Sequence, residues 1–331
     1  MTNQQKLISQ IKQLTEDNIM TLLDAVGLML DAQSKPQNPN CPYCGSHNII
    51  RYGHKCGKQR FLCKSCNRTF VPTTNTIMSH SHFPAEVWNE VIADTIHGNA
   101  IDYSAKRLGL YHQPVFDMRH KILLALQELP DIGDALLGGV SELDETFVLD
   151  CYKGRKLDAG AGRKARKHGA KAQKRGISNE YVCICAGIQR DGCAYAGTVN
   201  RTKPDAGELK QLFCGHIADG SLILCDGLRS YSVLSSFAEC TIKDCSYPVE
   251  GEKGFFHLNT VNGFHSFIKH RYNFYRGVAT KYLNRYNTLF ASAYRDAETL
   301  IGLLKAALLG VSRTDRYHSN SDVRGMGLLA I

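Results

Sequence analysis

Apolar residues recur at helical spacing near both ends of the chain. Residues 4–32 carry one such pattern, which predicts one or two helices before the Gln- and Pro-containing stretch 33–40. Residues 275–309 carry another, which predicts core helices that flank a sheet. The polar tail from Ser312 onward gives no clear prediction.

Three more helices are predicted between residues 83 and 130. They span about 84–98, 103–108 and 113–130, and glycine follows the first two. Three helices joined by short turns resemble a helix-turn-helix, in which the last helix contacts DNA. The residues it would present to DNA are Gln113, Arg119, His120 and Lys121. A packed helical linker is the alternative.

From Gly139 onward the pattern changes to strand-like runs. These runs are VSELDETFVLDCY, EYVCICAGIQ, CAYAGTVN and SLILCD, and the helix-like segment DAGELKQLFCGHI precedes the last of them. Strands followed by alternating helix and strand predict a mixed α/β sheet.

Two aspartates occupy strand positions otherwise suited to burial. Asp144 lies in the middle of the first strand, and Asp226 ends the apolar run 222–225, just before Gly227. A buried carboxylate is costly unless it is paired or bound to a metal, and Mg²⁺ prefers oxygen ligands. The pair therefore indicates a magnesium site, although a capping or turn role is the alternative for each aspartate alone.

The chain has 13 cysteines, and its N-terminus lacks an export signal, which favours reduced thiols or metal ligands over disulfides. Four of them form two C-x-x-C pairs, Cys41 with Cys44 and Cys63 with Cys66. Four thiolates suit one tetrahedral Zn²⁺, so a zinc ribbon is predicted, with a structural ion that has no open position for water. Cys56 is predicted to be a bystander.

The charge of the chain is unevenly spread. The net charge is +9, and ten basic residues lie between positions 153 and 175 against one acid. Such a segment suits DNA, because each Lys or Arg that meets a phosphate releases condensed counterions. We predict a flexible loop that binds the DNA backbone and is disordered without DNA; a solvated loop is the alternative. Its basic residues are Lys153, Arg155, Lys156, Arg163, Lys164, Arg166, Lys167, Lys171, Lys174 and Arg175.

The overall composition excludes several classes of protein. Of the 331 residues, 43% are hydrophobic and 21% charged, which excludes wholesale disorder and fibrous repeats. No apolar stretch approaches the roughly 18 residues that a membrane span needs. A soluble, intracellular protein of about two domains is expected, with no membrane partner.

Taken together, these features resemble the bacterial insertion-sequence transposases of the ISXO-like group, also called the IS-fifteen-ninety-five family. The resemblance covers roughly residues 38–300. An ordered set of segments carries it: CPYCG…FLCKSC, FDMRHKILLAL, ELDETFV followed by KGRK, CDGLRSY, and HLNTVNGFHSFIKHRYNFYRGVATKYLNRY. The set is far more specific than any one segment.

The resemblance implies a DDE-type active site that holds two divalent ions, Mg²⁺ or Mn²⁺. Asp144 matches the first catalytic aspartate and Asp226 the second. At the third position, where many relatives have Glu, this chain has Asn262, which lies 36 residues after Asp226. Asn can lend a carbonyl oxygen to Mg²⁺ but supplies no charge and cannot act as a base.

Some branches of the family are thought to use this Asn with a Lys further along the same helix face, and Lys269 stands at i+7 from Asn262. We therefore interpret Asn262 as a native variant and expect Lys269 to neutralise charge on the reacting phosphate. Glu250 or Glu252 is the alternative third carboxylate.

The resemblance also implies an RNase H-like catalytic domain behind the DNA-binding segments. The expected parts are N-terminal helices 1–37, a zinc ribbon 38–74, a helix-turn-helix-like segment 83–130, a catalytic domain 138–310 with the basic insertion 153–176, and a tail 311–331.

The expected function is that of a bacterial cytoplasmic DNA transposase. It would cut the ends of an insertion sequence and join them to target DNA. Its partners would be double-stranded DNA, both the terminal inverted repeats and the target, and further copies of the chain in a homo-oligomer. The alternatives are a catalytically inactive DNA-binding regulator and an RNase H-like nuclease without strand transfer.

Overall fold

The computed structural model describes residues 40–325 except for 56, 130–131, 133–134, 154–171, 175, 247–253, 276, 295–296, 298–299, 303 and 305–318. The chain divides into two compact units, Met1–Thr74 and Asn75–Ile331. The predictions for helices 4–32, Cys56, Glu250, Glu252, most of the basic segment and all of the tail except 319–325 lie outside the described residues.

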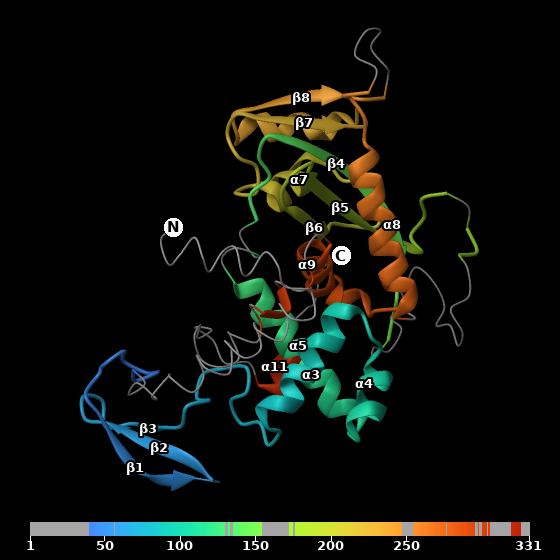
Figure 1. The fold of residues 1–331 in the computed structure, drawn as a ribbon. Coiled ribbons are helices and arrows are strands. Elements are labelled where there is room, and N and C mark those ends of the chain that lie inside the picture. The colour runs from blue at the N-terminus through green and yellow to red at the C-terminus, as the bar shows by residue number, and fades with distance from the viewer. Residues whose placement is uncertain are drawn as a thin grey trace, which may run out of the picture. The chain divides into compact units, whose positions relative to one another are not determined.

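The first unit contains a three-stranded antiparallel sheet in the order β1-β2-β3 (blue in Figure 1). The strands are β1 (Ile49–Lys55), β2 (Lys58–Cys63) and β3 (Thr69–Phe70). Strand β2 ends at Cys63, the first residue of the second cysteine pair. The rings of Phe61 and Phe70 stack 5.6 Å apart in a small core that also contains two of the paired cysteines.

The second unit is built on a five-stranded sheet in the order β6-β5-β4-β7-β8 (Figure 1). Its central strand pairs antiparallel with β5 and parallel with β7. The strands are β4 (Val140–Leu149), β5 (Tyr181–Gln189), β6 (Ala194–Thr198), β7 (Ser221–Cys225) and β8 (Cys240–Asp244). The mixed α/β sheet predicted from the strand-like runs is therefore confirmed.

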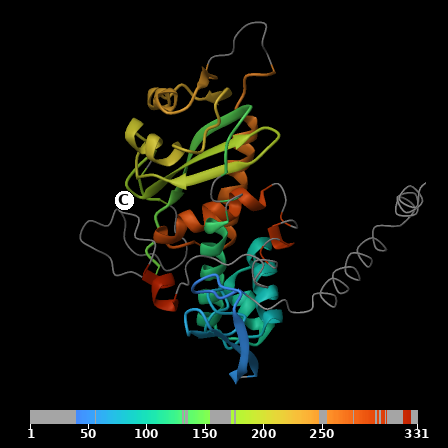
Figure 2. The ribbon, with the colours of Figure 1, turned by 90° about the vertical axis from the view of Figure 1, so that its left-hand side faces the viewer.

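Helices cover both faces of this sheet. Successive side chains of a strand point to opposite faces, so each buried strand contributes to a core on either side. In β5, Val182 and Ile184 pack toward the core that includes α8 (Asn259–Phe274) and α9 (Leu283–Ala293). The intervening Cys183 packs on the opposite face, against α7 (Ala206–Phe213) and the 3₁₀ helix η1 (Arg229–Ser236). Figure 2 shows α8 and α7 on opposite sides of the sheet.

The three helices predicted between residues 83 and 130 are present as α3 (Ala85–His97), α4 (Ile101–Leu108) and α5 (His112–Glu128). The first two end at Gly98 and Gly109, whose φ angles of 87° and 65° are left-handed and favour glycine. Buried residues of α5 join the core that α8 and α9 share.

Two short elements complete the described structure. They are η2 (Thr280–Tyr282) and α11 (Asn320–Gly325). Among the helices of the described residues, none has the length and apolar character that crossing a membrane requires.

Candidate functional site

The parallel pairing of β4 with β7 brings the two predicted aspartates together. The register pairs Glu142 with Leu224, and two residues beyond this last pair the carboxylate ligand atoms of Asp144 and Asp226 lie within 4.8 Å of each other. Asp226 follows the last residue of β7, and Gly227 turns the chain there with a φ of 77°. A Cβ at this glycine would lie 2.4 Å from the Asp244 carboxylate, so the turn also needs glycine for space.

A third carboxylate, Glu145, joins this pair. Ligand atoms of Asp144, Glu145 and Asp226 all lie within 4.8 Å of one another. Glu145 was not predicted from the sequence, because neighbouring residues in a strand point to opposite faces. The pairing of β4 with β7 stops at Glu142, whereas β5 stays paired with β4 past both acids, so the edge of β4 that faced β7 is open beside Asp144 and Glu145. The one sign of Glu145 in the sequence is that it stands next to Asp144 in an otherwise apolar strand.

Crowding and burial raise the affinity of Asp144 and Glu145 for protons. Burial, and then the charge of Asp226, raise the pKa of Asp144 to about 6, although a backbone hydrogen bond and the charges of Lys203 and Lys269 oppose the shift. Burial, followed by the charges of Asp226 and Asp144, raises the pKa of Glu145 to about 7. Crowded acids of this kind favour a bound cation, and the cluster fits a divalent metal ion that prefers oxygen ligands.

Helix α8 presents three polar side chains on the same side of the sheet as Asp144. Nδ1 of the buried His265 lies 3.7 Å from Oδ2 of Asp144. Burial, and then the charge of Lys269, lower the pKa of His265 to about 4, so its imidazole is neutral at pH 7. Lys269 is exposed and close enough to lower the pKa of Asp144. Asn262 is exposed one helical turn before His265.

The position of α8 is set by Glu142, whose side chain is fully buried in β4. One carboxylate oxygen accepts hydrogen bonds from the backbone N–H groups of Thr260 and Val261, at 2.8 and 3.0 Å. The other accepts from the Thr260 hydroxyl at 3.0 Å and from Arg190 Nε at 2.7 Å. The carboxylate thereby satisfies free N–H groups at the start of α8, where negative charge is favourable.

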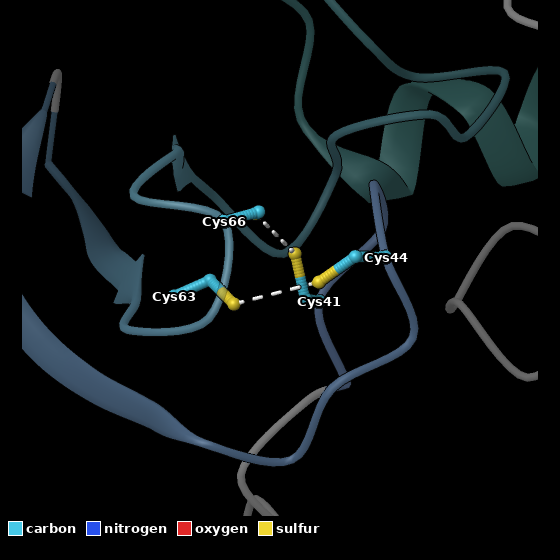
Figure 3. A group of neighbouring side chains, drawn as sticks. All are labelled: Cys41, Cys44, Cys63 and Cys66. Atoms are coloured by element: carbon cyan, nitrogen blue, oxygen red, sulfur yellow. Dashed lines mark hydrogen bonds between the residues drawn. The ribbon is translucent and has the colours of Figure 1, made fainter.

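The structure brings together the four cysteines that the sequence pairs (Figure 3). Their sulfurs lie within 4.8 Å of one another, and the Cys41–Cys66 and Cys44–Cys63 separations are both 3.6 Å. Sulfurs bound to one tetrahedral Zn²⁺ at 2.3 Å would be about 3.8 Å apart, so the group is compatible with a single zinc ion. No disulfide joins these four residues.

The four thiols differ in their pKa, and that of Cys63 is lowered. Burial acts to raise the pKa of Cys63, but hydrogen bonds from the backbone of Cys66 and Ser65 outweigh it and lower the pKa to about 6. Although a backbone hydrogen bond with Ser46 acts to lower the pKa of Cys44, burial and the neighbouring thiols raise it to about 12. Unequal sharing of protons is expected where four sulfurs crowd together without a bound cation.

The prediction that Arg119 and Lys121 face DNA is corrected by the structure, because both side chains are buried in α5. Arg119 donates from Nη2 to the Asn99 carbonyl at 2.7 Å, and its guanidinium lies 5.6 Å from the centre of the Tyr275 ring. The apolar spacing along α5 does not predict this burial, because it describes the helix alone. In the structure α5 is contacted by four other helices: α3, α4, α9 and α11. Gln113, in its first turn, is exposed.

Only two cations of the predicted basic segment lie within the described residues. Lys153 donates from Nζ to the Gly277 carbonyl at 2.9 Å, and Lys174 donates to Asn179 Oδ1 at 3.1 Å. The other eight lie outside the described residues: Arg155, Lys156, Arg163, Lys164, Arg166, Lys167, Lys171 and Arg175. Their contact with DNA stays a prediction.

Known proteins show similarity to this chain in sequence. Residues 136–295 match the family described as the ISXO2-like transposase domain. A protein of Halobacterium salinarum, named as an uncharacterized protein in transposable element ISH50, is 26% identical over 255 residues, which cover 76% of this chain and 83% of that relative. A chain of a pre-cleavage Mos1 transpososome is 12% identical with a TM-score of 0.28, and the match covers 67% of this chain and 76% of that one.

Replacing Glu142 by Ala should lower the free energy of unfolding by about 3–5 kcal/mol, because it leaves Arg190 Nε and two helix N–H groups without their acceptor. Denaturant unfolding followed by fluorescence of the single tryptophan, Trp88, reports on this unit. The control is Glu90→Ala, which removes an exposed ion pair with Arg107 at 2.6 Å and should cost less than about 1 kcal/mol. Equal losses in the two variants would contradict the assigned role of Glu142.

The raised pKa of Glu145 predicts a pH dependence of stability in buffer without added Mg²⁺. Between its ordinary value of 4.5 and about 7, the folded protein holds this proton more tightly than the unfolded chain does, so this group's effect is to lower stability as pH rises through that window. Glu145→Gln should therefore gain stability relative to the wild type between pH 4.5 and 7. Melting curves of both proteins at several pH values test this, and parallel pH profiles would refute it.

Proposed function

This chain belongs to the ISXO2-like transposase family through its domain at residues 136–295, and from that premise we propose that it cuts the ends of an insertion sequence and joins them to target DNA by two-metal-ion phosphoryl transfer. The observation that carries this proposal is the meeting of Asp144 and Asp226, from neighbouring parallel strands, within the family-matched domain.

We infer that the catalytic domain is RNase H-like. In chain order its sheet runs 3-2-1-4-5, the first three strands are antiparallel, and the fourth and fifth lie parallel to the first. The strand at the centre carries Asp144, and Asp226 follows the strand beside it. This arrangement supports the fold that the family resemblance implies, with a catalytic domain over residues 138–310.

The proposed site holds Mg²⁺ or Mn²⁺ on Asp144 and Asp226, with the amide oxygen of Asn262 as a neutral ligand. When bound, two such ions activate the attacking water or 3′-hydroxyl and stabilise the leaving oxygen. Lys269, whose charge reaches Asp144, would neutralise charge on the phosphate that reacts. His265 is buried and neutral beside Asp144, so it limits the directions in which that carboxylate can turn.

DNA is the proposed partner, held outside the catalytic site by the basic insertion 153–176, by the exposed first turn of α5 with Gln113, and by the ribbon unit 38–74. Between Asn40 and Thr74 the chain contains six Lys and Arg residues and no acidic residue. Phosphate contacts of this kind would position the duplex without reading its sequence. We also propose that the protein acts as a homo-oligomer on paired DNA ends.

We propose that the four clustered cysteines bind one structural Zn²⁺, so the purified protein should contain about one zinc ion per chain. Cys63→Ser should lose that ion and unfold the 40–74 unit, because metal binding supplies folding free energy to so small a core. Elemental analysis and circular dichroism measure both effects. Cys214→Ser, at an exposed cysteine outside the group, is the control and should keep the zinc. Full zinc content in the Cys63 variant would exclude the assignment.

Strand transfer should depend on the two aspartates and on Asn262. On a labelled duplex that carries the element's ends, with Mg²⁺ and target DNA, Asp226→Asn should reduce joining by about a hundredfold or more, since metal contacts supply several kcal/mol to the transition state. Asn262→Ala should also lose joining, whereas Asp191→Asn, at an exposed turn, should not.

The wild-type products of this assay decide between the proposed function and its alternatives. Cutting without joining would indicate a nuclease. Binding of the ends without cutting, under either Mg²⁺ or Mn²⁺, would indicate a DNA-binding regulator and leave the aspartates with a structural role.

A further inference from the structure

We infer that Glu145 supplies the third carboxylate of the proposed metal site, next to Asp144 and Asp226. This inference rests on the proposed function and deepens it. In this assignment the third acid comes from β4, the strand that already carries Asp144, and α8 contributes only neutral or positive groups near the site: Asn262, His265 and Lys269.

The charge of the site favours such a residue. Two divalent cations carry four positive charges, and Asp144 with Asp226 offsets two of them. Asn262 offers an amide oxygen without charge, and Lys203 and Lys269 add further positive charge near Asp144. Glu145 is the third acid whose ligand atom meets those of both aspartates within the described residues.

The distances fit shared ligation. The three ligand atoms lie within 4.8 Å of one another. Two oxygens that bind one Mg²⁺ at about 2.1 Å can be at most about 4.2 Å apart, so a shift of roughly half an ångström would bring the widest pair onto a single ion. In two-metal sites the ions lie about 3.5–4 Å apart, which is comparable to the spacing of these three ligand atoms.

The environment of Glu145 satisfies its carboxylate only in part. Its Oε1 is buried and accepts no hydrogen bond within the described part of the chain, and the neighbouring Tyr231 hydroxyl is the hydrogen-bonding side chain that acts to lower its pKa. A buried oxygen without a donor is unfavourable, and a cation would satisfy it. Glu142, three residues earlier in the same strand, shows the contrast, because its two oxygens accept four hydrogen bonds from α8 and Arg190.

Glu145 also approaches from the side of the sheet opposite to α8. Asp144 contacts His265 of α8, whereas Glu145 lies near Tyr231 of η1 and Cys185 of β5, which belong to the other core. Asp226 stands between them, beyond the end of β7. Asp144 from one face of the sheet and Glu145 from the other thus meet at Asp226.

Binding of Mn²⁺ to the full-length, zinc-loaded protein tests this inference without a DNA substrate. Free Mn²⁺ is titrated by electron paramagnetic resonance against the wild type, Glu145→Gln, Asp226→Asn and Asn262→Ala. Glu239→Gln, the same substitution at an exposed position away from the cluster, is the matched control. Tyr231→Phe tests whether Glu145 instead serves the neighbouring tyrosine.

Glu145→Gln should weaken Mn²⁺ binding by about tenfold or more, as Asp226→Asn does, and should abolish the rise in melting temperature that Mg²⁺ gives the wild type. Without metal its melting temperature should equal or exceed that of the wild type, because one of three crowded charges is gone. Glu239→Gln and Tyr231→Phe should bind Mn²⁺ as the wild type does.

Two results would overturn the inference. One is wild-type Mn²⁺ affinity in Glu145→Gln while Asp226→Asn loses binding; the proposed function would then stand with a different third ligand. The other is a lower melting temperature without metal in both Glu145→Gln and Tyr231→Phe, which would make the carboxylate structural. Failure of the proposed function looks different, since the wild type would then bind no Mn²⁺ and cut no DNA.

Discussion

The buried carboxylate of Glu142 is the interaction on which the geometry of the site depends. It lies in the central strand, carries no exposed surface, and receives hydrogen bonds from the first residues of α8 and from Arg190. A buried charge tolerates little change in the direction or distance of its partners. The start of α8 is therefore fixed against β4 two residues before Asp144, and Asn262, His265 and Lys269 take their positions from that contact.

Three acids within four positions of β4 have different roles because of the donors around them. Glu142 has four hydrogen bonds and needs no further partner. Asp144 and Glu145 face each other's charge and that of Asp226, and burial raises the pKa of each. A carboxylate whose oxygens all have donors stabilises the fold, whereas a cluster of acids with fewer donors than oxygens favours a bound cation.

Basic residues also divide into two groups, those buried in the core and those exposed to solvent. Arg119 is fully buried and is held by the Asn99 carbonyl and the Tyr275 ring, and Arg285 donates to the Val323 carbonyl inside the core beside His120. These cations join helices to one another and are not available to DNA. The net positive charge of the chain therefore overstates what a polyanion could contact, and the cations open to it lie on exposed segments such as β1, which carries Arg51 and Lys55.

The sequence alone determined the elements that local chemistry specifies. These are three helices, the first two of which end at glycine, strands with a run of apolar residues, two C-x-x-C turns, and aspartates in otherwise apolar strands. It also indicated the family, because the ordered motifs are specific. Burial of Arg119, the role of Glu142 and the arrival of Glu145 beside Asp226 were decided by tertiary structure. Helical or strand periodicity describes one element at a time, whereas these outcomes depend on which neighbour covers each face and where a paired strand stops.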